Sequence, residues 1–172
     1  LSRLTKEKGI HLLIEAYRRV KTDKKLVIAG GSSDSNDYVQ YLHKLAEGDE
    51  RIIFTGFVQG QELEELYSNA YVYVLPSELE GMPLSLLEAM SYGNCCLTSD
   101  ISENKDVIGK HGLTFKTNDE EDMTKCLQNL ENKPIIVNEY KANAASYICE
   151  KYNWDEVTER TLDLYYKSVS YT

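Results

Sequence analysis

Short apolar strands alternate with amphipathic helices along this 172-residue sequence, up to about Phe115. The clearest strand, Tyr71–Leu75, is β-branched and aromatic without strict alternation, which is typical of a strand buried on both faces. Strands and helices that alternate at this spacing predict right-handed β–α–β units and a parallel sheet covered by helices on both faces. The expected fold class is therefore α/β, a doubly wound parallel sheet of Rossmann-like type, in one domain over residues 1–172.

The individual elements follow from the same apolar patterns. Strands are expected at residues 25–29, 51–54, 71–75, 94–98 and 112–115, with helices beginning near residues 10, 38, 61, 84, 104, 119, 134 and 154. Residues 32–37 are expected to form a polar loop, and Asp119 is expected to cap a helix. No strand precedes the opening loop, so we expect the first strand of this domain to lie upstream of Leu1.

Glycine and polar residues gather where the predicted strands end, which is where ligands bind to such sheets. The four strand ends are Gly30-Gly31, Thr55-Gly56-Phe57, Ser77–Met82 and Ser99-Asp100. Glycine lets a backbone approach a ligand closely, although tight turns alone would also explain it. Beside these ends, Arg3 and Lys8 in the opening loop could supply cations. The pattern favours a ligand that carries phosphate.

The stretch from Glu80 to Glu88 runs from the loop after one predicted strand into the next predicted helix. We expect Gly81 to permit a tight turn, Pro83 to take the first helical position, and the helix start to leave N–H groups free for an anion. The two glutamates would bracket that site. In a chain this acidic, they could equally be an ordinary loop carboxylate and a residue on a solvated helix face.

Composition excludes several classes of function. A net charge of −9 argues against a nucleic-acid surface, which needs a basic patch, and it means that local cations must attract any phosphate ligand. The sequence contains no run of about 18 apolar residues, so no membrane span is predicted, and it does not begin with a signal peptide. The four cysteines lack a CxxC spacing, and buried thiols in a reducing cytoplasm are the expected explanation. No metal site and no role for any histidine is predicted.

Neither a GxGxxG fingerprint nor a GxxxxGK[ST] loop follows any predicted strand. Dinucleotide-dependent dehydrogenases and P-loop kinases are therefore disfavoured. The segments present form an ordered set instead. They are Ser2-Arg3-Leu4 to Lys8-Gly9, Leu26–Gly31, Phe54–Val58, Leu75-Pro76-Ser77, the E-x7-E pair Glu80 and Glu88 with Ala89, Met90 and Gly93, and the terminal helix Tyr152–Tyr165 with Trp154.

In this order, the segments resemble the C-terminal, nucleotide-sugar-binding domain of retaining GT-B glycosyltransferases of family 4 (glycosyl transferases group 1). The resemblance implies that Arg3 and Lys8 bind the donor diphosphate and stabilise the leaving nucleoside diphosphate, and that Glu80 contacts hydroxyls of the donor sugar. These three would be the catalytic residues. Other substrate-binding positions would be Gly30 and Gly31, Phe57 and Val58 beside the base, the backbone of Gly81, Met82, Pro83 and Leu84, and Glu88 on the ribose. Pro83 replaces a glycine found in many members.

The resemblance further implies an enzyme that transfers a sugar from a UDP- or GDP-type donor to an unidentified acceptor in polysaccharide or glycoconjugate biosynthesis. No metal or other cofactor is expected. The acceptor site would lie on a separate N-terminal domain, so this half alone should bind donor without turnover. A cytoplasmic enzyme is expected, with any membrane attachment through the other half. Two alternatives remain: a non-catalytic nucleotide-binding module, and a GT-B sugar-nucleotide epimerase, which the Glu80–Glu88 spacing disfavours.

Overall fold

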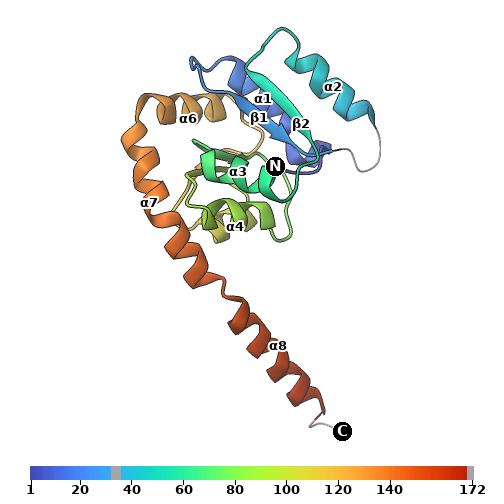
Figure 1. The fold of residues 1–172 in the computed structure, drawn as a ribbon, viewed down its shortest axis with the longest axis vertical. Coiled ribbons are helices and arrows are strands. Elements are labelled where there is room, and N and C mark those ends of the chain that lie inside the picture. Colours follow the sequence, from blue (N-terminus) through green and yellow to red (C-terminus); the bar gives the residue numbers. More distant parts are fainter. Residues whose placement is uncertain (32–35, 170–172) are drawn as a thin grey trace.

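A computed structural model describes residues 1–31 and 36–169, which form helices packed around five short parallel strands (Figure 1). The strands are β1 (Leu26–Ala29), β2 (Ile52–Gly56), β3 (Tyr73–Leu75), β4 (Cys96–Ser99) and β5 (Leu113–Phe115). The helices are a 3-10 turn (Lys6–Lys8), α1 (Ile10–Arg18), α2 (Asn36–Ala46), α3 (Gln61–Asn69), α4 (Leu84–Ser91), α5 (Ser102–Ile108), α6 (Glu120–Asn132), α7 (Pro134–Lys151) and α8 (Trp154–Val169). The α/β class and the parallel strand direction are confirmed.

The strands form two sheets rather than one. β1 pairs with β2, and β3 pairs with β4, which pairs with β5, all in parallel. The α/β fold class is as expected, and the described strands divide into a two-stranded and a three-stranded parallel sheet. The break falls between β1 and β3, because the edges of these two strands that face each other carry no pairing partner among the described residues.

Most predicted helices occur where the apolar periodicity placed them. The Asp119 side chain accepts a 2.8 Å hydrogen bond from the N–H of Asp122 and so caps α6, as predicted. Pro134 stands in the first turn of α7. Pro83 does not take the first helical position. It is the N-cap of α4, with φ −77° and ψ 76°, and the helix begins at Leu84. Most of the predicted loop 32–37 lies outside the described residues.

Apolar side chains from both faces of the strands form the core. One cluster joins β3 and β4 to α4 and α7, a second joins β4 and β5 to α1 and α6, and a third joins β1 to α1 and α2. Cys95 and Cys96 are buried in this core, as expected. Cys149 is exposed on α7, so the expectation of buried thiols is wrong there.

Helix α8 projects away from the rest of the molecule and is the last element that the structure describes (Figure 1). The side chains of residues 155–168 are exposed. Within residues 1–31 and 36–169, no helix is both long and apolar enough to cross a membrane.

Candidate functional site

Lys8 and Glu80 meet at the carboxyl ends of the strands, although 72 positions separate them in the sequence. Lys8 Nζ lies 2.7 Å from Glu80 Oε1, and only 16% of the lysine side chain and 7% of the glutamate side chain are exposed. An ion pair with this little solvent around it is held more firmly than a surface pair. The fold thus brings together two of the three residues for which the sequence predicts a catalytic role.

The backbone of the opening loop is braced against the loop that follows β3. The N–H of Glu78 donates a 2.8 Å hydrogen bond to the carbonyl oxygen of Glu7. The Thr5 hydroxyl donates to Glu7 Oε1 at 2.6 Å, and this bond is the main cause that lowers the pKa of Glu7. Lys8 and Glu80 therefore lie on two loops that are hydrogen-bonded to each other.

A glycine makes this approach of the two loops possible. Gly9 has φ +65°, and a Cβ placed there would lie 2.2 Å from the carbonyl oxygen of Pro76. No other residue fits so close to another backbone. Gly9 also precedes α1 directly, so the contact positions the start of that helix beside the end of β3.

Arg3 lies in the same opening loop as Lys8, but its side chain makes fewer contacts than that of Lys8. The N–H groups of its neighbours Ser2 and Leu4 donate to the carbonyl oxygens of Ala29 and Gly31, at 3.1 and 2.9 Å. These bonds hold the loop against the end of β1. The Arg3 side chain is exposed and forms no ion pair with the described part of the chain.

The start of α4 offers fewer free N–H groups than expected. The N–H of Leu84 donates to Met82 O at 2.9 Å, and those of Leu86 and Leu87 donate to Pro83 O at 2.9 and 3.2 Å. Ser85 keeps the first-turn N–H that makes no hydrogen bond within residues 1–31 and 36–169. The expectation of a broad cluster of free donors is therefore wrong, and one donor remains for an anion.

Gly81 does not need to be glycine for its own conformation. Its φ lies outside the left-handed region, and an added Cβ would meet no atom within 4 Å in the part of the chain that the structure describes. The expected glycine-dependent turn is therefore wrong, although the space above Gly81 is open. The neighbouring side chains of Met82 and Leu84 are exposed, at 55% and 58%.

Phe57 and Val58, which are predicted to flank a base, lie just after β2 and differ in solvent exposure. The Phe57 side chain is 75% exposed, whereas Val58 is buried. Gly30 is buried, whereas a Cβ added at Gly31 would meet no atom of the described residues within 4 Å. A ligand role for these four residues stays a prediction.

Tyr67 on α3 is not among the site residues predicted from the sequence. Its hydroxyl donates to Glu88 Oε2 at 2.9 Å and lies 3.3 Å from Ser85 O, and its ring stacks on Tyr92. Burial, followed by the influence of Tyr73 and then Glu88, raises the pKa of Tyr67, so the phenol stays protonated and donates. Tyr67 therefore orients the second glutamate of the E-x7-E pair.

We expect Tyr67→Phe to weaken binding of a nucleoside diphosphate about threefold to tenfold, because Glu88 would lose the hydrogen bond that fixes its carboxylate. Isothermal titration calorimetry measures this change. The matched control is Tyr92→Phe, since the Tyr92 hydroxyl makes no hydrogen bond to the residues described, while its ring takes part in the same stack. Equal affinities for the two variants would contradict the orienting role of Tyr67.

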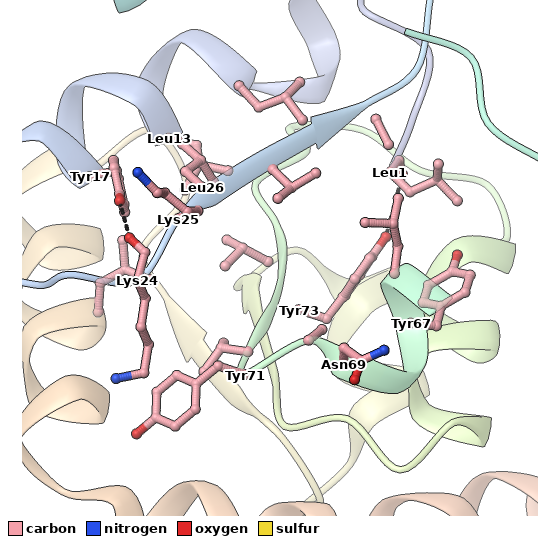
Figure 2. Close-up of a pocket in the computed structure, with 18 of the residues that line it drawn as sticks. Leu1, Leu13, Tyr17, Lys24, Lys25, Leu26, Tyr67, Asn69, Tyr71 and Tyr73 are labelled. Atoms are coloured by element: carbon pink, nitrogen blue, oxygen red, sulfur yellow. Dashed lines mark hydrogen bonds between the residues drawn. The ribbon is translucent and has the colours of Figure 1, made fainter. Parts of the chain in front are cut away.

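A cavity formed by the described residues lies away from these side chains. It has a volume of about 540 Å³ and lies between β1 and β3, with a mostly apolar lining (Figure 2). None of Arg3, Lys8, Glu80 and Glu88 lines it. Over residues 1–31 and 36–169, no cluster of three or more His, Cys, Asp or Glu side chains could hold a metal ion.

The chain resembles known glycosyltransferases in both sequence and fold. The sequence profile of the family Glycosyl transferases group 1 matches residues 1–162. The chain is 33% identical to the uncharacterized glycosyltransferase MJ1607 of Methanocaldococcus jannaschii, over 96% of this chain and 43% of that protein. It is 32% identical to the sulfoquinovosyl transferase SQD2 of Arabidopsis thaliana, over 93% of this chain and 31% of that protein.

Among solved structures, HepE of Anabaena in complex with UDP-glucose superposes with a TM-score of 0.90 at 17% sequence identity, over 97% of this chain and 47% of HepE. The chain thus spans less than half the length of these relatives. Because the family profile matches nearly the whole sequence and the fold agrees, this chain belongs to the glycosyl transferases group 1 family and has the architecture of GT-B glycosyltransferase structures.

Proposed function

We propose that this chain is the C-terminal, donor-binding half of a retaining glycosyltransferase that takes its sugar from a nucleoside-diphosphate sugar. The observation that carries the proposal is the Lys8–Glu80 pair, at 2.7 Å, beside the start of α4. A cation and a carboxylate in contact at the ends of parallel strands suit a ligand that presents phosphate oxygens next to sugar hydroxyls. The solved complexes of HepE with UDP and with UDP-glucose support the same ligand class.

The chemistry requires stabilisation of a leaving group. When the bond between the anomeric carbon and the diphosphate breaks, negative charge grows on the departing oxygen. The ammonium of Lys8, the guanidinium of Arg3 and the N–H of Ser85 are the groups that would stabilise this charge. Such local donors would also overcome the repulsion from a chain of net charge −9. We expect the stabilisation of the leaving diphosphate to need no metal ion.

The carboxylates would bind hydroxyl groups. Lys8 forms an ion pair with Glu80 in the structure. When a donor is bound, Lys8 would turn to the diphosphate and Glu80 would accept hydrogen bonds from the sugar. Glu88, oriented by Tyr67, would accept from the ribose. The acceptor site would be supplied by another part of the full-length protein, so this half binds donor without transferring it.

The experiment that tests the proposal is a calorimetric titration of the chain with UDP, GDP and ADP, with and without magnesium. We expect selective binding of one diphosphate, unaffected by magnesium. Glu88→Ala should weaken that binding about tenfold or more, because the ribose hydroxyls lose a charged acceptor worth about 1.5–3 kcal/mol.

Glu64→Ala is the matched control, because Glu64 is an exposed carboxylate on α3 and has no part in the proposed site. It should leave the affinity unchanged. If Glu88→Ala binds as tightly as the unchanged chain, the ribose assignment fails. If none of the three diphosphates binds, the proposal that this half alone forms the donor site is wrong.

A further inference from the structure

A buried row of polar groups lies behind the loop that carries Glu80. Ser99, at the end of β4, and Asn104, on α5, are both fully covered, with 0% of each residue exposed. The Ser99 hydroxyl donates a 2.5 Å hydrogen bond to the carbonyl oxygen of Ser77, in the loop that follows β3. Asn104 Nδ2 lies 2.9 Å from Ser99 Oγ and 3.4 Å from Ser99 O. Buried polar groups that are connected in this way restrict the geometry of the backbone they contact.

The hydrogen bonds in this row run in one direction. A carbonyl oxygen can only accept, so the single proton of the Ser99 hydroxyl is used on Ser77 O. Ser99 Oγ can therefore only accept from Asn104, and the Ser99 carbonyl beside it can only accept as well. These two acceptors require the NH2 group of the Asn104 side chain to face Ser99. Asn104 thus orients the hydroxyl that donates to Ser77.

The row ends at an amide group that is hydrogen-bonded on both sides. The peptide group between Ser77 and Glu78 accepts from Ser99 through its carbonyl oxygen. Its N–H, that of Glu78, donates to Glu7 O in the opening loop at 2.8 Å. An amide that accepts a hydrogen bond becomes a better donor, because the bond polarises it. The hydrogen bond from Ser99 therefore strengthens the one to Glu7.

This amide lies close in the chain to both members of the Lys8–Glu80 ion pair. Glu7 directly precedes Lys8, and Glu78 lies two positions before Glu80. In the proposed function Lys8 turns from Glu80 to the diphosphate, so the ion pair no longer joins the two loops. The hydrogen bond from Glu78 to Glu7 still joins them. If Ser77 O lost its bond to Ser99, the peptide group would be free to rotate, and the backbone beside Lys8 would shift.

We propose that Ser99 and Asn104 are positioning residues for the donor diphosphate. Through the amide between residues 77 and 78, they hold the opening loop so that the ammonium of Lys8 meets the phosphates. Both are fully buried, so they act through the backbone and not by contact with the ligand. The inference rests on the proposed function and extends it to β4 and α5, which contribute no side chain to the proposed site.

The first arm of the test uses the chain without ligand and measures backbone amide hydrogen exchange by NMR. Exchange at the N–H of Glu78 should be faster by about tenfold or more in Ser99→Ala, and by about threefold or more in Asn104→Leu, because the amide loses its polarising partner. The matched control is Thr98→Val. It removes a fully buried hydroxyl from the adjacent residue of β4, which donates to Ser99 O and not to the loop after β3. Thr98→Val should leave exchange at Glu78 unchanged.

The second arm measures dissociation constants by calorimetry for UDP, GDP and ADP and for the three corresponding nucleosides. Ser99→Ala should raise the dissociation constant of the diphosphate that binds by about threefold to tenfold and leave that of its nucleoside unchanged. A general disturbance of the fold would weaken the binding of both. In a Lys8→Ala background, Ser99→Ala should have no further effect on the diphosphate, because it acts through Lys8.

Unchanged exchange at Glu78 in Ser99→Ala would overturn the proposal, as would equal acceleration in Thr98→Val. An unchanged diphosphate affinity in Ser99→Ala would also overturn it, as would an equal loss of affinity with and without Lys8. If Ser99→Ala does not fold, Asn104→Leu gives the same two readouts. The proposed function fails by a different result. The unchanged chain would then bind none of the three diphosphates, which would overturn the role of both residues in binding as well.

Discussion

Gly30→Ala is expected to destabilise the chain by about 3 kcal/mol or more. Gly30 has φ +144°, and a Cβ there would lie 1.8 Å from the carbonyl oxygen of Ser2. The substitution therefore combines backbone strain of about 1–3 kcal/mol with an overlap that only backbone movement can relieve. It would push the opening loop away from β1 and break the hydrogen bond from Ser2 to Ala29. Urea unfolding followed by circular dichroism measures the loss.

The adjacent glycine is the matched control. No atom of residues 1–31 and 36–169 lies within 4 Å of a Cβ added at Gly31, and the φ of Gly31 lies outside the left-handed region. Gly31→Ala should change the free energy of unfolding by less than about 0.5 kcal/mol. If the two variants unfold at the same urea concentration, the close contact between Gly30 and Ser2 is not a feature of the protein in solution.

Lys8→Ala is expected to raise the dissociation constant for a nucleoside diphosphate about tenfold to a hundredfold, and to leave the affinity for the corresponding nucleoside nearly unchanged. The Lys8 ammonium would contact the diphosphate in the proposed site, and a charge-assisted hydrogen bond to phosphate contributes about 1.5–3 kcal/mol. The comparison of UDP with uridine in calorimetry separates a phosphate contact from a general disturbance of the site.

Loss of Lys8 also removes the cation from Glu80, whose side chain is only 7% exposed in the intact pair. Unfolding should therefore be followed for Lys8→Ala and for the double variant with Glu80→Gln, which removes the uncompensated charge. Lys6→Ala is the matched control, because Lys6 is an exposed lysine in the same 3-10 turn. Equal losses of affinity for UDP and uridine in Lys8→Ala would contradict a phosphate role.

Much of the fold was predictable because it depends on local patterns. The apolar periodicity of α3 and the capping side chain of Asp119 act within a few residues, and both occur as predicted. Two predictions were wrong, namely that Gly81 forms a glycine-dependent turn and that Pro83 takes the first helical position. The backbone angles of these two residues depend on how the loop after β3 packs against the opening loop, and the local residue types do not determine that packing.

The sequence by itself determined the order of strands and helices, the strand ends where a ligand would bind, and the residues available there, Lys8, Glu80 and Glu88 among them. Periodicity and residue chemistry suffice for that. Only the tertiary structure decided that Lys8 pairs with Glu80, that Tyr67 holds Glu88, and that the sheet divides between β1 and β3. These features join segments far apart in the chain, and their geometry depends on the packing of whole helices and strands, which no local pattern records.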